Sequence, residues 1–192
     1  MASHERILPP MPDPVPLRLH CFVEIPKGSR NKYEWDDELG AIKLDRFLFS
    51  SVVYPTDYGF VPQTLGKDGD PLDAMVCVSE PTFPGCVIPV KPIALFKMHD
   101  DKGEDDKVLC VPLHDPNWNA MERLDDLPLF LRDEISHFFS MYKQPEGKVV
   151  KVDGWYPLEA ALDAIEDGRR RYERGHEKPA SGTVGAEARP DQ

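Results

Sequence analysis

Three carboxylates stand within six residues of this 192-residue chain. They are Asp68, Asp70 and Asp73, in the run Asp-Gly-Asp-Pro-Leu-Asp that immediately precedes an apolar stretch. Two unit charges about 5 Å apart repel by roughly 3 kcal/mol at an effective dielectric of about 20, so acids gathered at the edge of a fold need a counterion. A hard divalent cation with oxygen ligands meets that need. The run therefore predicts a metal site.

The residues between the acids favour a fixed loop. Gly69 can adopt backbone angles that other residues avoid, and Pro71 fixes its own φ and pushes Asp70 toward extended geometry. Acidic turns of this kind are also common as plain surface loops, which leaves that reading open for the run in isolation. A calcium-binding EF-hand is excluded, because positions 5 and 6 of such a loop would be Leu72 and Asp73 in place of an oxygen ligand and a glycine.

A second acidic cluster lies between residues 99 and 107. It contains Asp100, Asp101, Glu104, Asp105 and Asp106 around Gly103. Charged hairpin tips are often only solvated, but cations and phenols elsewhere in the chain suggest a shared purpose. These are Lys32, Arg46, Lys107, Lys143, Tyr54 and Tyr58. Phosphoryl transfer needs metal ions to neutralise phosphate oxygens and cationic donors to hold the leaving phosphate, which this inventory supplies. The P-loop pattern GxxxxGK[ST] of nucleotide hydrolases is absent from the sequence.

Composition narrows the class of protein. The 34 acids exceed the 23 bases and give a net charge of -11, which argues against a general binder of nucleic acid or anionic membranes. The sequence has no apolar run of roughly 18 residues and no apolar signal core, so we expect a cytoplasmic protein. Cys21, Cys77, Cys86 and Cys110 form no CxxC pair, which favours reduced, mostly buried thiols over a zinc or redox site.

The elements that position these residues are expected to form one domain, residues 17–176. A flexible, proline-rich arm (1–16) would precede it and a flexible tail (177–192) would follow it. Alternation from Leu17 to Ile25 predicts a half-buried strand, and the next strand places Lys32 and Glu34 on one face. Short strands are expected up to about residue 111, followed by helices.

Arg46 breaks the pattern of the third strand. It shares one parity with Ile42, Leu44 and Leu48, where an apolar side chain is expected. Either its stem lies on apolar surface and its tip reaches water, or it clamps an anion inside a cleft. Further strands are predicted at 74–78, 87–98 and 108–111, and the prolines at 89 and 92 suggest edges or bulges that break the second of these.

Helical spacing dominates the C-terminal third. A helix should begin near Asp126, with Pro128 in its first turn. Its predicted core-facing residues are Leu127, Phe130, Leu131, Ile135, Phe138, Phe139 and Tyr142. Tyr142 and Lys143 close this helix, and periodicity alone favours a structural role for the pair. A last helix should run from about residue 157 to 174, with Gly175 as its stop.

Taken together, these motifs resemble the soluble family I inorganic pyrophosphatases of the bacterial type. The run at 68–73 looks like the signature of that family. Five further blocks follow the family's order: EIPKGSRNKYE at 24–34, LDRF at 44–47, YPTDYGF at 54–60, KMHDDKGEDDK at 97–107 and HFFSMYK at 137–143. The resemblance covers about residues 17–170. It implies an α+β, mainly β fold, in which a distorted five-stranded OB-like barrel carries flanking C-terminal helices and a site in its mouth.

The resemblance also implies a role for each matched residue. Asp70 would be the general base for direct attack of metal-bound hydroxide on diphosphate, giving two orthophosphates without a phosphoenzyme. Asp68, Asp73 and Asp105 would bind a first Mg²⁺, and Asp73 would bridge toward a second. Asp100 and Asp105 would bind a third ion and Glu34 a fourth. The resemblance thus implies three to four ions per site. The phosphates would be held by Lys32, Arg46, Tyr54, Lys107, Tyr142 and Lys143. Glu24 and Tyr58 would support the metal waters.

Assembly and two alternative functions stay open at this point. Bacterial members of the family are often hexamers, and His137 matches an interface residue, whereas Ser140 does not match the histidine that some interfaces carry. A homo-hexamer is therefore favoured over a trimer or dimer. The same acids could serve a two-metal phosphohydrolase acting on nucleotides or phosphoesters. A divalent-cation or phosphate-binding module without catalysis is the third possibility.

Overall fold

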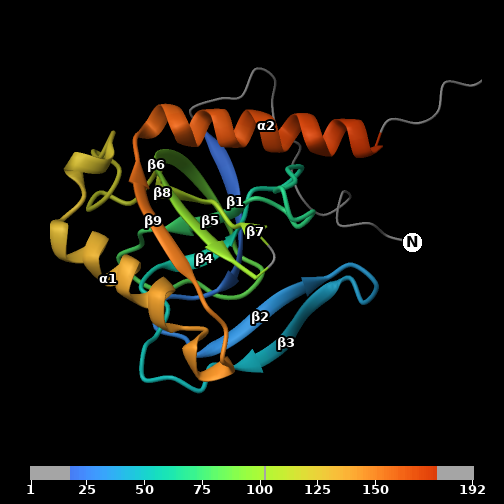
Figure 1. Cartoon of the computed structure of the whole chain (residues 1–192). Coiled ribbons are helices and arrows are strands. Elements are labelled where there is room, and N and C mark those ends of the chain that lie inside the picture. Colours follow the sequence, from blue (N-terminus) through green and yellow to red (C-terminus); the bar gives the residue numbers. More distant parts are fainter. Residues whose placement is uncertain (1–17, 102, 177–192) are drawn as a thin grey trace, which may run out of the picture.

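The computed structural model describes residues 18–101 and 103–176 (Figure 1). The predicted proline-rich arm and C-terminal tail lie outside the described residues. The strands are β1 Leu19–Ile25, β2 Asn31–Asp36, β3 Ala41–Phe47, β4 Asp57–Phe60, β5 Asp73–Val76, β6 Val87–Asp100, β7 Gly103–Glu104, β8 Lys107–Pro112 and β9 Lys151–Tyr156. The helices are α1 Leu129–Met141 and α2 Leu158–His176, with 3-10 turns η2 Leu124–Asp126 and η3 Gln144–Glu146.

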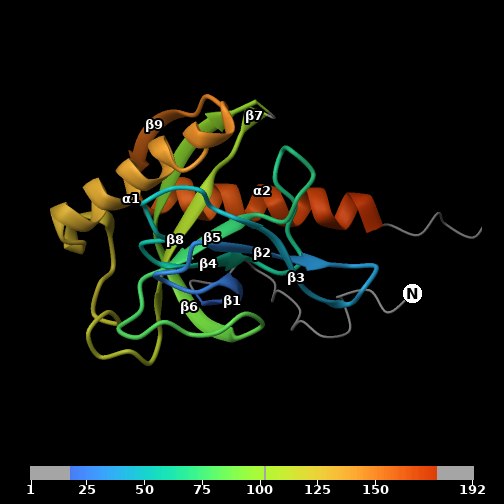
Figure 2. The same ribbon diagram turned by 90° about the horizontal axis from the view of Figure 1, so that it is seen from below.

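Five strands close into a ring. β1 pairs with β4, β4 with β5, β5 with β8, β8 with β6, and β6 returns to β1. The β5–β8 pair is parallel and the other four pairs are antiparallel. β7 and β9 extend this sheet from β6, while β2 and β3 form a separate two-stranded hairpin (Figures 1 and 2). The ring and its two following helices agree with the α+β, mainly β, OB-like prediction.

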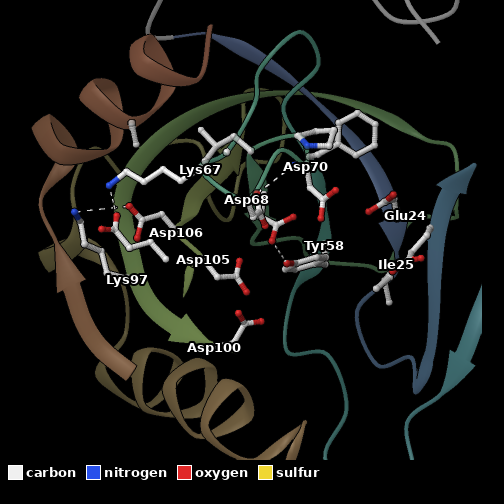
Figure 3. Close-up of a pocket in the computed structure, with 18 of the residues that line it drawn as sticks. Glu24, Ile25, Tyr58, Lys67, Asp68, Asp70, Lys97, Asp100, Asp105 and Asp106 are labelled. Atoms are coloured by element: carbon white, nitrogen blue, oxygen red, sulfur yellow. Dashed lines mark hydrogen bonds and ion pairs between the residues drawn. The ribbon is translucent and has the colours of Figure 1, made fainter. Parts of the chain in front are cut away.

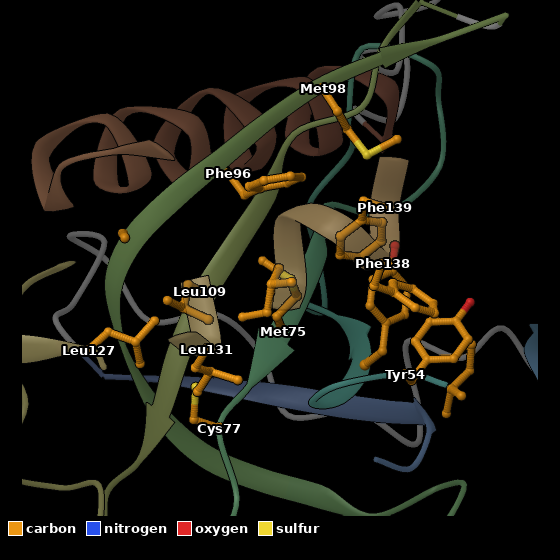
Figure 4. Packing of buried hydrophobic residues seen from close by; sticks show 14 of the residues in the cluster. Tyr54, Met75, Cys77, Phe96, Met98, Leu109, Leu127, Leu131, Phe138 and Phe139 are labelled. Atoms are coloured by element: carbon orange, nitrogen blue, oxygen red, sulfur yellow. The ribbon is translucent and has the colours of Figure 1, made fainter. Parts of the chain in front are cut away.

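The two helices cover different sides of the ring. Phe138 and Phe139 of α1 pack against Met75 of β5 and Phe96 of β6 in one apolar cluster (Figure 4). Ala161 and Ile165 of α2 belong to a second cluster with residues of β1, β5, β6 and β8. Burying a large apolar side chain contributes about 1.5–3 kcal/mol, so each helix is fixed to the ring mainly by its apolar stripe.

Three strand predictions need correction. The sixth strand was expected to be broken but is continuous from Val87 to Asp100. The bulge that its prolines predicted is present, as a register shift between Pro92 and Ala94. Leu44 is exposed although it shares its parity with half-buried Ile42. A bulge at Asp45 in the β2–β3 pairing stands between Leu44 and Arg46, so the two do not share one face as expected. β4 and β9 were not predicted at all, since neither shows clear alternation. The thiols of Cys21, Cys77 and Cys110 are buried and that of Cys86 is half-buried, all four unbonded, as predicted.

The helix boundaries also differ from prediction. α1 begins at Leu129, with Pro128 as its N-cap, and the turn before it is a 3-10 turn. Phe130 is 72 % exposed, because it lies on the same face as polar residues 133, 134 and 137 and away from the core. Gly175 keeps helical backbone and α2 continues to His176, so this glycine is not a stop. Among the helices in the described ranges, none combines the length and apolarity needed to cross a membrane.

Candidate active site

A cavity of about 650 Å³ opens at the mouth of the ring (Figure 3). The acid run, the second acidic cluster, the β2–β3 hairpin and the segment after α1 all contribute to its wall. The predicted site residues that line it are Glu24, Lys32, Glu34, Arg46, Tyr58, Asp68, Asp70, Asp73, Asp100, Asp105, Tyr142 and Lys143. Residues from six separate sequence blocks thus meet around one space, which the sequence could suggest only through the resemblance.

Lys107 lies beneath this cavity and is only 1 % exposed. Its ammonium donates to Asp73 Oδ2 at 2.7 Å, to Asp105 Oδ1 at 2.6 Å and to the Tyr58 hydroxyl at 2.9 Å. The parallel β5–β8 register, which pairs Asp73 with Lys107, builds this contact. Tyr58 also donates a short hydrogen bond to Asp73. In the described state, Lys107 therefore contacts two carboxylates and does not line the cavity.

Tyr54 is the other predicted site residue that does not line the cavity. It is buried, and the centroid of its ring lies 4.6 Å from the ring centroid of Phe138 and 5.4 Å from that of Tyr58. Burial raises the pKa of Tyr54, Tyr58 and Tyr142 well above the ordinary phenol value, so all three hydroxyls keep their protons. These phenols can donate hydrogen bonds to an anion or a carboxylate.

Burial of negative charge sets the electrostatics of the site. It raises the pKa of Asp73 to about 6 in spite of Lys107, and raises the pKa of Glu24 to about 8 although Trp35 N–H donates to Glu24 at 2.8 Å. Burial also raises the pKa of Asp68. Burial alone would lower the pKa of Lys107, but Asp73 and Asp105 outweigh it and raise that pKa. Without a bound cation, the negative charge of the carboxylates in the site therefore exceeds the positive charge of its lysines and arginines.

The donor set suits hard divalent cations. Asp68 and Asp70 from the acid run, Asp100 from the end of β6 and Asp105 from the segment before β8 approach one space (Figure 3). Carboxylate oxygens are the ligands that Mg²⁺ prefers. A cation there would stabilise the ionised form of carboxylates whose pKa burial raises. In the part of the chain that the structure describes, no three acidic, histidine or cysteine side chains converge closely enough to enclose an ion as they stand. The predicted ligands thus share a cavity without forming a closed coordination shell.

The acid run forms an ordered loop. Gly69 has φ +91°, as its expected conformational freedom suggested. Gly66 N–H donates to Asp70 O at 2.6 Å, and Asp70 N–H donates to Asp68 Oδ1 at 3.2 Å. These bonds fix the backbone that carries Asp68 and Asp70, while the two side chains face the cavity.

Cations at the rim are each paired with a carboxylate. Lys32 pairs with Glu34, as their predicted common face requires. Arg46 contacts Asp45 at 2.9 Å and Glu146 at 2.9 Å. Elsewhere on the wall, Lys143 contacts Asp100 at 2.5 Å. Arg46 lines the cavity with a side chain 35 % exposed, which is the position that the anion-clamp alternative requires.

Sequence reasoning missed the contribution of α2. Asp163, Asp167 and Arg171 line the same cavity. Their spacing of four residues places them on one helix face, and this spacing could have predicted from the sequence that they act together. It could not show that this face turns toward the acid run, since that depends on how α2 docks on the ring.

Comparisons with known proteins agree with the arrangement. A family model described as "Inorganic pyrophosphatase" matches residues 21–173. The chain is 61 % identical over 151 residues to an inorganic pyrophosphatase from Methanosarcina acetivorans, covering 79 % of this chain and 90 % of that protein. It is 53 % identical over 157 residues to one from Streptomyces coelicolor, covering 81 % and 96 %.

Solved structures are similar as well. The structure of an inorganic pyrophosphatase from Thermus thermophilus superimposes with a TM-score of 0.82 at 44 % identity, covering 86 % of this chain and 97 % of that one. A type I inorganic pyrophosphatase from Toxoplasma gondii gives a TM-score of 0.78 at 28 % identity, covering 87 % and 85 %.

Proposed function

Since this chain belongs to the inorganic pyrophosphatase family, we propose that it hydrolyses inorganic diphosphate to two orthophosphates in the acidic cavity. The observation that carries this proposal is the gathering of the predicted acids, cations and phenols from separate blocks around one cavity. The family uses divalent metal ions. We take Mg²⁺ to be the ion, with three to four bound per site.

Each ion has proposed ligands among the lining residues. Asp68, Asp73 and Asp105 would hold the first ion and Asp73 would reach toward the second. Asp100 and Asp105 would hold a third, and Glu34 a fourth. Bound Mg²⁺ supplies charge neutralisation of the phosphate oxygens and makes water easier to deprotonate. Glu24 would accept hydrogen bonds from waters next to the ions.

The protein's own residues divide the remaining work. Asp70 is exposed at the edge of the cavity and is proposed to take the proton from the attacking water at a carboxylate oxygen. Lys32, Arg46 and Lys143, with the Tyr142 hydroxyl, would hold the two phosphates and stabilise the charge on the leaving one. Lys107 and Tyr58 hold Asp73, and Lys107 also holds Asp105, by the bonds described above. Tyr54 and Lys107 would reach phosphate only after a side-chain rearrangement.

The proposal extends to the setting of the enzyme. We infer a cytoplasmic homo-oligomer, with a hexamer favoured, built from one domain of residues 17–176. The exposed Leu129 and Phe130 of α1 support association, because they add apolar surface to the helix that carries His137.

A phosphate-release assay tests the proposal. Purified protein with millimolar Mg²⁺ should release phosphate from diphosphate, and a chelator should abolish the release. Release from ATP at a rate equal to or above that from diphosphate would favour the broader phosphohydrolase. Absence of release from either compound would favour a binding module.

A further inference from the structure

Helix α2 holds the stem of the acid loop through one residue. Leu65 N–H donates to the Gly168 carbonyl at 3.0 Å, and Arg171 Nε donates to the Leu65 carbonyl at 2.8 Å. Both backbone polar groups of Leu65 are therefore bonded to the same helix, one turn apart. This is a two-point attachment, which fixes orientation as well as distance.

Steric crowding explains why position 168 is a glycine. A Cβ atom there would lie 3.2 Å from Thr64 Cβ and 3.3 Å from Leu65 O, closer than side chains normally pack. Glycine is among the least favourable residues inside a helix, so helix stability alone would select another residue. The close approach of α2 to residues 64 and 65 accounts for it.

Hydrogen bonds carry this attachment forward to the acids. Beyond Leu65, Gly66 N–H is bonded to Asp70 O, and Asp70 N–H to Asp68 Oδ1. A Cβ at Gly66 would lie 2.7 Å from Asp68 Oδ1, so the loop closes tightly on itself. Before it, the Thr64 hydroxyl donates to Val61 O at 2.6 Å and accepts from Leu72 N–H at 3.1 Å. Hydrogen bonds thus link residues 64–72 to one another across the loop.

We propose that Gly168 and Arg171 are positioning residues, which set the place of Asp68 and Asp70 in the cavity through Leu65. The inference deepens the proposed function and rests on it for its catalytic consequence. It gives α2, which supplies none of the predicted metal or phosphate ligands, a part in the reaction. A shift of the loop by a few tenths of an ångström would move a ligand and the base together.

Two pairs of variants separate positioning from helix stability. Gly168→Ala adds the crowding methyl, whereas Gly175→Ala makes the same change on the same helix where a Cβ would meet only Leu65 Cδ1 at 3.9 Å. Arg171→Met removes the donor to Leu65. Arg170→Met removes an arginine of α2 that is 61 % exposed and whose side chain, among the described residues, bonds to Glu166 of the same helix. Arg171→Lys keeps a donor and serves as the conservative variant.

Hydrogen exchange of residues 64–72, measured on the full chain without substrate, reads the attachment directly. We expect exchange at Leu65 and Gly66 to be about 10-fold faster in Arg171→Met, with Arg170→Met unchanged and Arg171→Lys in between. In the diphosphate assay, kcat should fall roughly 10-fold in Gly168→Ala and Arg171→Met, with the two controls within about twofold of wild type.

The outcomes distinguish the two claims. Equal exchange in Arg171→Met and Arg170→Met, or equal kcat in Gly168→Ala and Gly175→Ala, would overturn the positioning role. If wild type releases no phosphate from diphosphate, the proposed function fails, and the exchange comparison still decides whether α2 holds the loop.

Discussion

The floor and the rim of the cavity are built in opposite ways. Lys107, Asp73 and Tyr58 form the floor on strands of the closed ring, and Lys107 is 1 % exposed. Lys32 and Arg46 stand at the rim on the separate β2–β3 hairpin, with side chains 20 % and 35 % exposed. In the floor, Lys107 is shielded from water and the Asp73 side chain is 27 % exposed to the cavity. The two rim cations are both partly solvated and belong to a two-stranded hairpin.

This difference suits two tasks. Breaking a buried ion pair by removing one partner costs about 3–5 kcal/mol, because the other charge is left uncompensated. An exposed pair contributes only about 0–1 kcal/mol. On the proposed function, we therefore expect the floor to hold its carboxylates in place for metal ions, and the rim cations to exchange a carboxylate partner for a phosphate at little cost.

Removing one lysine from each region tests directly whether the floor and the rim differ in stability. Lys107→Met leaves Asp73 and Asp105 without their shared cation, and we expect its free energy of unfolding to fall by about 3–5 kcal/mol. Lys32→Met, the rim counterpart, should change it by less than about 1 kcal/mol. Urea unfolding with a chelator present measures both. Equal losses in the two variants would mean that the floor and rim do not differ as described.

The pH dependence of the unfolding free energy tests the burial of Glu24 on β1 of the ring. Burial raises the folded-state pKa of Glu24 from 4.5 to about 8, so the folded chain binds this proton more tightly than the unfolded chain. The stability that Glu24 contributes is complete below pH 4.5 and is lost as pH rises through about 8. Glu24→Gln has no such loss. We expect its advantage over wild type to grow by about 1–3 kcal/mol from pH 5 to pH 9 in chelator.

Chemical unfolding of both proteins at several pH values checks this expectation. Gln can still accept the hydrogen bond from Trp35 N–H, so the variant isolates the ionisation. Parallel stability curves for the two proteins would show that Glu24 is not titrating across this range.

The smallest expected effect concerns the rim. Glu146 contacts Arg46 at 2.9 Å and, on the proposed function, would compete with phosphate for it. Glu146→Gln should lower KM for diphosphate about two- to fivefold and leave kcat unchanged, which matches the roughly 0.5–1 kcal/mol of an exposed ion pair. Glu122→Gln, which loses an exposed partner of Lys91, is the control. A higher KM in Glu146→Gln would show that this carboxylate helps to bind substrate.

What the sequence could predict depended on the range of the interactions. The acid run owes its conformation to neighbouring residues, and Gly69 adopts the conformation that its type suggested. Periodicity likewise identified most of the buried face of α1. Phe130 was assigned to the wrong face because a hydrophobic residue can also occupy a polar stripe.

Contacts between segments that are distant in the sequence could not be predicted from local sequence patterns. Lys107 reads in the sequence as one cation in an acidic hairpin, and its burial follows from the parallel pairing of β5 with β8 across more than thirty residues. The docking of Gly168 on Leu65 has the same origin. The bulge between Leu44 and Arg46 is different, because it lies within a local hairpin and adds one residue that alternation cannot reveal. Only the ordered blocks of the family resemblance indicated that these residues converge.

The most direct test of the central claim is the turnover of Asp70→Asn with diphosphate at saturating Mg²⁺. Asp70 on its exposed loop is proposed to transfer the proton, and the buried Lys107 below it to give structural support. We therefore expect a kcat lower by roughly 100-fold or more, the usual scale for losing a general base. The unfolding midpoint and the hydrogen exchange of residues 64–72 should match wild type. Unchanged turnover in this variant would contradict the account.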